Sequence, residues 1–200
     1  MLLSRTLRPL LLGALLPLAG CMDMTADASG QPAGALPVMR WDHRPEATQW
    51  TEATLEALKS EGAVLASTVP MDVEHYCPDY ETASVAEREA FWAGLFSAIA
   101  KYESTWNPAA KGAGGKYLGL LQISPATANY VGCDLSEAGL TDGASNLACA
   151  VRIAANRVPD EATEADQEAI AAIVTDWGPM HDKSKRAEVA AWTRTQSYCS

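Results

Sequence analysis

The 200-residue sequence predicts a mainly α-helical domain with one short extended element and two disulfides. Apolar residues recur at the three- and four-residue spacing of amphipathic helices along much of the chain, whereas only residues 117–123 suggest an extended segment. Besides Cys21 there are four cysteines, an even number that is typical of two disulfides in an exported domain. About 120 residues are enough to bury a core, which the disulfides would reinforce.

The first residues predict export. Arg5 and Arg8 precede a short apolar stretch, Leu10 to Leu18, which is too short to span a bilayer as a permanent helix. The stretch runs into Leu-Ala-Gly and then Cys21, a pattern that resembles the lipobox of bacterial lipoproteins. The resemblance implies a signal peptide at residues 1–20 and lipidation of Cys21, which would anchor the protein to a membrane. An ordinary secretory signal with a chance cysteine is the alternative.

The mature chain is expected to be acidic and tethered. Removing the signal takes away two arginines and no acidic residue, so the formal net charge changes from −10 to −12. This balance argues against binding nucleic acid or the surface of an anionic membrane. Residues 21–47, rich in Ala, Gly, Pro, Asp and Ser, predict a lipidated cysteine and a flexible tether. Met22 stands where Asp commonly signals inner-membrane retention, which favours the outer membrane, with the domain facing the periplasm.

The remaining residues divide into an N-terminal helical segment, 48–76, and a main domain, 77–200. Thr48 to Lys59 predicts a first helix that ends before Gly62, and the sequence leaves open whether it packs on the main domain. In the main domain, Ser84 to Glu87 forms a capping box at the start of a long helix. Further helices are expected at 124–131, 147–158, 165–175 and 183–194.

The four remaining cysteines permit three pairings. We expect Cys133–Cys149 as a local bridge and Cys77–Cys199 as a bridge between the two ends of the domain. On the chain-entropy model each would stabilise the fold by roughly 3–5 kcal/mol. A zinc site or a catalytic thiol is a poor alternative, because no two cysteines have CxxC spacing.

Glu103 is the leading candidate for catalysis. Trp92, Leu95, Phe96 and Ile99 form one apolar helix face, and Glu103 continues the same spacing at the end of the run. Burial and the negative end of the helix dipole both disfavour an ionised carboxylate, so we expect a raised pKa that suits a general acid. The alternative is a solvated helix-end carboxylate, or one paired with a nearby lysine.

Three motifs follow one another within 26 residues: Glu-Ser-Thr-Trp-Asn-Pro (103–108), Gly-Leu-Leu-Gln-Ile (119–123) and Ser-Pro-Ala-Thr-Ala (124–128). In this order they resemble the catalytic core of the lytic transglycosylase SLT domain, which belongs to the lysozyme-like superfamily. Leu121 replaces a usual methionine, and weaker similarity continues to about residue 179. The resemblance implies a lysozyme-like helical fold, peptidoglycan glycan strands as substrate, and neither cofactor nor metal.

The resemblance also implies roles for individual residues. Glu103 would act first as general acid and then as base, cleaving the β-1,4 bond between N-acetylmuramic acid and N-acetylglucosamine and leaving 1,6-anhydromuramyl ends. Ser104 would orient the glutamate or the substrate, or else only complete the helix end. Gln122 would line the sugar cleft, with a buried structural amide as its alternative. Tyr117 and Trp177 either stack on sugar faces or pack in the core.

The third family motif is altered. The family usually has Ala-Tyr-Asn followed by Gly, and the tyrosine hydroxyl contacts the catalytic carboxyl; here Thr175 and Asp176 take the tyrosine and asparagine places before Trp177 and Gly178. Asp176 either caps a turn or supplies a second carboxylate that would activate water, as in a hydrolytic muramidase. A third interpretation is a non-catalytic lipoprotein that binds glycan.

Overall fold

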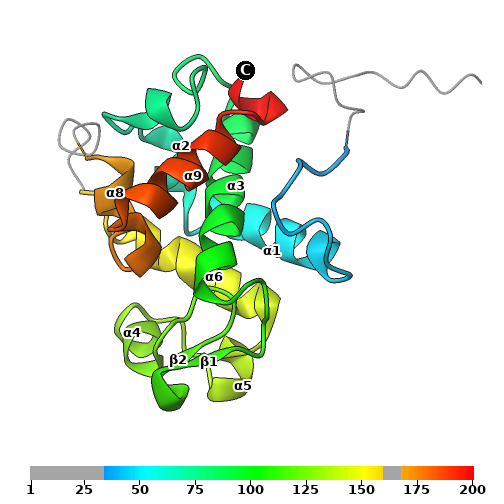
Figure 1. The fold of residues 1–200 in the computed structure, drawn as a ribbon, viewed down its shortest axis with the longest axis vertical. Helices are drawn as coiled ribbons and strands as arrows, with labels where there is room; N and C mark the ends of the chain where they lie inside the picture. Colours follow the sequence, from blue (N-terminus) through cyan, green and yellow to red (C-terminus); the bar gives the residue numbers. More distant parts are fainter. Residues whose placement is uncertain (1–33, 160–167) are drawn as a thin grey trace, which may run out of the picture. The chain divides into compact units, whose positions relative to one another are not determined.

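A computed structural model describes residues 34–159 and 168–200, and Gly34–Ser200 belong to one compact unit (Figure 1). Its architecture is mainly helical with one small antiparallel sheet, which confirms the predicted fold class. The expected signal peptide and Cys21 lie outside the described residues. Among the helices that are described, none combines the length and apolar character needed to cross a membrane.

Helix α3 (Val85–Glu103) is the centre of the domain (Figure 1). It begins at the predicted capping box, in which the Ser84 side chain accepts from the Glu87 backbone N–H and the Glu87 carboxylate accepts from the Ser84 N–H. Helices α1, α2 and α9 pack against it, which explains why it is apolar on nearly all sides. Its fully buried aromatic and large aliphatic residues are Phe91, Trp92, Leu95, Phe96 and Ile99.

The N-terminal helical segment packs on the main domain. Helix α1 (Ala47–Lys59) lies against α6 (Gly143–Ala155) and α3, and the short helix α2 (Ala63–Ser67) contacts the same two helices. The structure thereby resolves the point that the sequence left open. The 3-10 turn η1 (Val73–His75) then leads to the first disulfide cysteine, Cys77.

The folded part begins earlier than the expected tether boundary at residue 47. Met39 is 2% exposed and Trp41 is fully buried, and the indole N–H of Trp41 donates to Thr51 Oγ1 at 3.0 Å. The expectation of a flexible tether is therefore wrong for this stretch. This packing depends on two large apolar side chains that are not spaced as in a helix or a strand. Hydrophobic periodicity therefore did not predict their burial.

A small sheet and two short helices form the part of the domain below α3 in Figure 1. Strand β1 (Lys111–Gly112) pairs with β2 (Tyr117–Leu118) across the turn η2 (Ala113–Gly115). The predicted extended segment, 117–123, is extended only at its start, because the chain turns at residues 119–122 before Ile123 pairs back with Leu118. Helices α4 (Pro125–Tyr130) and α5 (Glu137–Leu140) follow.

The C-terminal part returns to α3. Helix α8 (Ile170–Ile173) is shorter than the expected helix over 165–175, part of which lies outside the described residues. The turn η3 (Gly178–Met180) leads into α9 (Lys183–Thr193), close to the predicted bounds. The chain ends in the turn η4 (Ser197–Cys199), which contacts α3.

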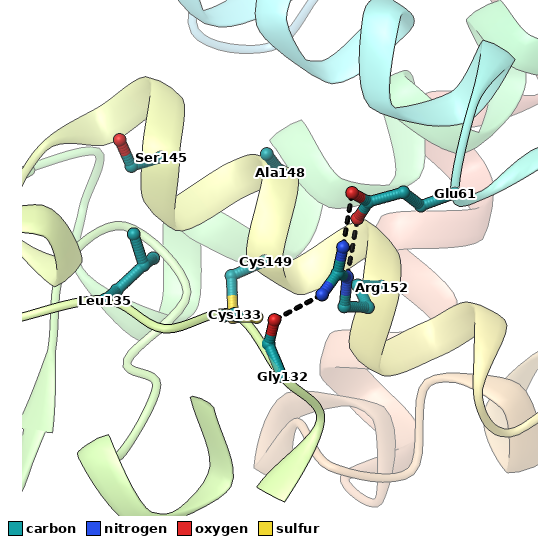
Figure 2. A pocket seen from close by; sticks show the side chains of 8 residues that line it. All are labelled: Glu61, Gly132, Cys133, Leu135, Ser145, Ala148, Cys149 and Arg152. Atoms are coloured by element: carbon teal, nitrogen blue, oxygen red, sulfur yellow. Dashed lines mark hydrogen bonds and ion pairs between the residues drawn. A yellow bond between two sulfur atoms is a disulfide. The ribbon is translucent and has the colours of Figure 1, made fainter. Parts of the chain in front are cut away.

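Both predicted disulfides are confirmed. Cys77–Cys199 joins the two ends of the main domain with a Cα–Cα distance of 4.6 Å, and Cys133–Cys149 joins the loop after α4 to α6 with a Cα–Cα distance of 5.7 Å. Figure 2 shows the second bridge beside Arg152, whose guanidinium forms an ion pair with Glu61 and donates to the Gly132 carbonyl oxygen. These contacts hold α6 to the segments on both sides of it.

Candidate active site

Glu103 is the last residue of α3, as the helical spacing predicts. Its side chain is half-buried, and burial raises the pKa of its carboxyl from the ordinary 4.5 to about 7, with the positive charge of Lys185 acting in the opposite direction. The carboxyl also lies at the negative end of the α3 dipole, which disfavours its ionised form further. A carboxylic acid with a pKa near neutral can both give and take a proton at physiological pH.

Glu103 lines a cleft of about 440 Å³. Four other predicted site residues line the same cleft: Tyr117, Gln122, Asp176 and Trp177. They come from β2, from the turn that follows it and from the segment after α8. The most distant of them in sequence, Trp177, lies 74 residues after Glu103, so it is the fold that brings them together. The other lining residues are Tyr102, Gly178, Pro179 and Lys185.

A second hollow of about 180 Å³ adjoins this cleft. The two share Tyr117, Gln122, Asp176 and Trp177, so they form one groove with Glu103 in its larger part. The smaller part is completed by side chains from the turn after β2, from α4 and from α6: Leu121, Ile123, Ser124, Thr127 and Ile153. A groove that runs past the acid suits an extended ligand better than a small compact one.

Gln122 is held in one orientation. Its backbone has a positive φ of 48°, and its side-chain Nε2 donates to the Gly119 oxygen at 2.9 Å and to the Ala110 oxygen at 3.3 Å. Both amide protons are thus used within the protein. In the described part of the chain no donor meets Oε1, which lies beside Gly112, so this oxygen keeps the capacity to accept a hydrogen bond.

Asn146 of α6, to which sequence reasoning assigned no site role, anchors the turn that carries Gln122. It is fully buried, its Nδ2 donates to the Leu118 and Leu140 oxygens, and its Oδ1 accepts from the Leu121 N–H at 2.9 Å. Gly119 has φ 79°, and a Cβ there would lie 2.1 Å from the Leu140 oxygen and 2.4 Å from Asn146 Nδ2. Only glycine fits this approach.

Ser104 does not line the cleft as the structure describes it. It is the C-cap residue of α3, and its Oγ donates to the Ala100 oxygen at 3.3 Å. This geometry favours the alternative interpretation, in which the serine completes the helix end.

The two predicted aromatic residues differ in exposure. Trp177 is 3% exposed, its indole N–H donates to the Leu121 oxygen at 2.9 Å, and its ring meets Phe96 edge-on with centroids 5.7 Å apart. It therefore forms the wall of the cleft and ties the turn after β2 to the core. Tyr117 is 37% exposed at the rim, where the Lys116 ammonium nitrogen lies 5.2 Å from its ring centroid, and the exposed part of the ring can stack on a ligand.

Asp176 is bound by Arg157. Its two carboxylate oxygens accept hydrogen bonds from Arg157 Nε at 2.7 Å and Nη2 at 2.8 Å. Such a two-point ion pair fixes the orientation of the carboxylate and occupies an acceptor site on each oxygen. Thr175, at the place of the family tyrosine, is not among the cleft-lining residues that the structure describes.

Two cleft residues with polar side chains, Tyr102 and Lys185, were missed from the sequence. The Tyr102 hydroxyl donates to Glu188 of α9, and the same carboxylate accepts from Lys101 and Arg40. These three donors lower the pKa of Glu188 to about 2, so it is a fixed anion that holds α9 against the end of α3. Tyr102 directly precedes Glu103, but no local signal indicates that α9 returns to this point.

A separate hollow of about 240 Å³, drawn in Figure 2, lacks comparable chemistry. Its charged side chains, Glu61 and Arg152, neutralise each other, and the hydrogen bond from Arg152 lowers the pKa of the Glu61 carboxyl. Across residues 34–159 and 168–200, no cluster of three or more His, Cys, Asp or Glu side chains could hold a metal ion. The Glu103 cleft is therefore the candidate active site.

Known proteins resemble this chain in fold and, over part of its length, in sequence. Solved structures of Bd0314 DslA, a wild-type form and two glutamate-to-glutamine mutants, superpose with TM-scores of 0.69 to 0.70 at 25% sequence identity, covering 84% of this chain and 100% of theirs. The comparison with curated proteins gave no match. Residues 82–174, which include Glu103 and Gln122, match the family model of the transglycosylase SLT domain, and this match implies an enzyme that cleaves the glycan strands of peptidoglycan.

Proposed function

We propose that the protein is a peptidoglycan lytic transglycosylase that cleaves the β-1,4 bond between N-acetylmuramic acid and N-acetylglucosamine. The observation that carries the proposal is the half-buried Glu103 carboxyl, with its pKa raised to about 7, in a groove with Gln122 and Tyr117. The match to the transglycosylase SLT domain supports the substrate class.

In the proposed reaction the protonated Glu103 donates its proton to the glycosidic oxygen, and the bond to C1 of the muramyl residue breaks. The 2-acetamido group of the same sugar stabilises the positive charge that develops at C1. Glu103, now a carboxylate, accepts the proton of the muramyl C6 hydroxyl, whose oxygen closes onto C1. The products are a 1,6-anhydromuramyl end and a free 4-hydroxyl on the other sugar, and no water is consumed. General acid–base catalysis of this kind contributes on the order of 10²–10⁴-fold.

The groove supplies positioning groups for this substrate. Oε1 of Gln122 is suited to accept from a sugar hydroxyl or an acetamido N–H, and the Tyr117 ring at the rim is suited to stack on a sugar face. Trp177 acts behind them as a rigid wall. Ser104 acts indirectly, by ending α3 where the Glu103 carboxyl enters the cleft.

The second candidate function is a hydrolytic muramidase in which Asp176 activates water. It is favoured by one observation, that Asp176 lines the same cleft as Glu103. Against it stands the two-point ion pair with Arg157, in which both carboxylate oxygens already accept hydrogen bonds and neither is free of a partner to take a proton from water. A non-catalytic glycan-binding lipoprotein is the third candidate, and its support is Thr175 in place of the family tyrosine.

We also propose that the enzyme works from the outer membrane, anchored through a lipidated Cys21 and facing the periplasm. The lipobox-like sequence that ends at Cys21 supports this location. Labelling with a radioactive or alkyne-tagged fatty acid tests it: the wild-type protein is expected to carry the label and fractionate with outer membranes. A Cys21→Ala variant that is labelled equally would contradict it.

The function is tested by incubating residues 22–200 with purified sacculi and identifying the released fragments by mass spectrometry. We expect 1,6-anhydromuramyl ends from the parent protein and from Glu52→Gln, an exposed control on α1, but none from Glu103→Gln. Reducing ends, heavier by one water, would favour the hydrolase. Binding to sacculi without release of fragments would favour the glycan-binding protein.

A further inference from the structure

Lys185 of α9 is half-buried and is the one cation that lines the Glu103 cleft in the described part of the chain. Within residues 34–159 and 168–200 its ammonium group has no carboxylate in an ion pair. Of the other cations near the cleft, Arg157 binds Asp176 and Lys101 binds Glu188, while Lys116 lies outside the lining with its ammonium nitrogen 5.2 Å from the centroid of the Tyr117 ring. An unpaired lysine in the cleft of a chain with a net charge of −10 points to an anionic group on the ligand.

The position of Lys185 is fixed by its neighbours. Asp182 caps the start of α9 by accepting from the backbone N–H groups of Ser184 and Lys185. One turn further along α9, Glu188 is bound by the Tyr102 hydroxyl at the end of α3. The Lys185 ammonium nitrogen lies 5.7 Å from the centroid of the Tyr102 ring, at a distance at which a cation and an aromatic face attract each other.

Glu103 does not serve as the partner of this lysine. Burial dominates over the attraction of Lys185 and leaves the Glu103 carboxyl largely protonated below neutral pH, which is also the form that acts as the general acid. The lysine therefore faces the substrate with its charge largely uncompensated by Glu103 at the moment when the substrate binds.

The muramyl residues of a glycan strand carry carboxylates to which a lysine can bind. The backbone of alternating amino sugars is neutral, and its muramyl residues carry a lactyl arm that ends either in a free carboxylate or in an amide-linked stem peptide with its own carboxylates. We propose that Lys185 is a specificity-determining residue that binds a carboxylate of the muramyl arm. The inference rests on the proposed function and adds the reason why a muramyl sugar would be selected over a neutral one.

Binding measurements separate this role from catalysis. All proteins carry Glu103→Gln, which prevents turnover and removes any effect of Lys185 on the Glu103 charge. Affinities at pH 7 are measured by calorimetry for three ligands of equal length: peptide-free muramyl glycan, the same glycan with stem peptides, and a neutral chitin oligomer. Lys185→Met is compared with Lys185→Arg, which keeps the charge, and with Lys183→Met, which changes an exposed lysine on the same helix.

We expect Lys185→Met to weaken binding of at least one carboxylate-bearing glycan by about tenfold and to leave chitin binding unchanged, while Lys185→Arg and Lys183→Met stay close to the parent. Whichever muramyl glycan loses affinity identifies the lactyl or the stem-peptide carboxylate as the group bound. Equal losses for all ligands, or no loss for either muramyl glycan, would overturn the proposed role of Lys185 and leave the proposed function standing. If the parent binds none of the three glycans, the proposed function itself fails.

Discussion

The ionised form of Glu103 is expected to destabilise the fold, and replacing it should therefore stabilise the protein at high pH. The carboxyl has an ordinary pKa of 4.5 and a folded-state pKa of about 7. Because the folded state holds this proton more tightly than the unfolded state, the favourable contribution is fully present below pH 4.5 and is lost as the pH rises through 7. A catalytic acid tuned in this way trades stability for function.

The magnitude follows from the shift in pKa. Each pKa unit corresponds to 1.36 kcal/mol, so the full shift is worth about 3 kcal/mol, and partial contact with solvent reduces the expected effect to about 2 kcal/mol. Glu103→Gln keeps the shape of the side chain and removes the charge. Its free energy of unfolding at pH 8.5 should exceed that of the parent by about 2 kcal/mol, which corresponds to about 4–8 °C in Tm.

The assay is urea unfolding of residues 22–200 at pH 4 and at pH 8.5, with Glu52→Gln as the control for a loss of charge at the surface. We expect the stabilisation by Glu103→Gln at pH 8.5 and little difference at pH 4, where the parent carboxyl is also neutral. A gain of the same size at both pH values, or a loss at pH 8.5, would refute the reasoning that burial disfavours the Glu103 charge.

Three further variants test the cleft and the fold that carries it. Asp176→Asn should retain 1,6-anhydromuramyl products with less than about a tenfold loss of rate, since Arg157 already binds both oxygens and the residue would not be the base; loss of all activity on sacculi would count against this role. Gly119→Ala should lower the free energy of unfolding by about 3 kcal/mol or more in urea titrations, because its Cβ would overlap the Leu140 oxygen; an unchanged midpoint would contradict the geometry. Replacing Cys77 and Cys199 together by serine should cost about 5 kcal/mol by the same measurement, since the bridge closes a loop of 122 residues, and a cost below about 1 kcal/mol would be inconsistent with that argument.

Local signals in the sequence were sufficient for the longer helices and for the position of the acid, but not for the short helices α2 and α5. The capping box at Ser84 and the apolar spacing up to Glu103 act over one or two helical turns, and the structure has both of them. The pairing Cys77–Cys199 was also predictable, because few pairings exist and one of them joins the ends of the domain.

Features that depend on packing between distant segments were not predictable. Met39 and Trp41 lie in a stretch with the composition of a tether, and only their burial against the domain shows that it is folded. Lys185 has the sequence surroundings of a solvated helix residue, and it reaches the cleft because the network around Glu188 holds α9 against the end of α3. Asn146 likewise acquires its role only when α6 meets the turn after β2.

The central claim is that Glu103 breaks the glycosidic bond without water entering the product. The most direct test is digestion of sacculi in water labelled with heavy oxygen, followed by mass spectrometry of the newly formed muramyl ends. The account predicts anhydro ends that contain no label and that disappear with Glu103→Gln. Muramyl ends that carry one labelled oxygen would contradict it and would assign the chemistry to a hydrolase.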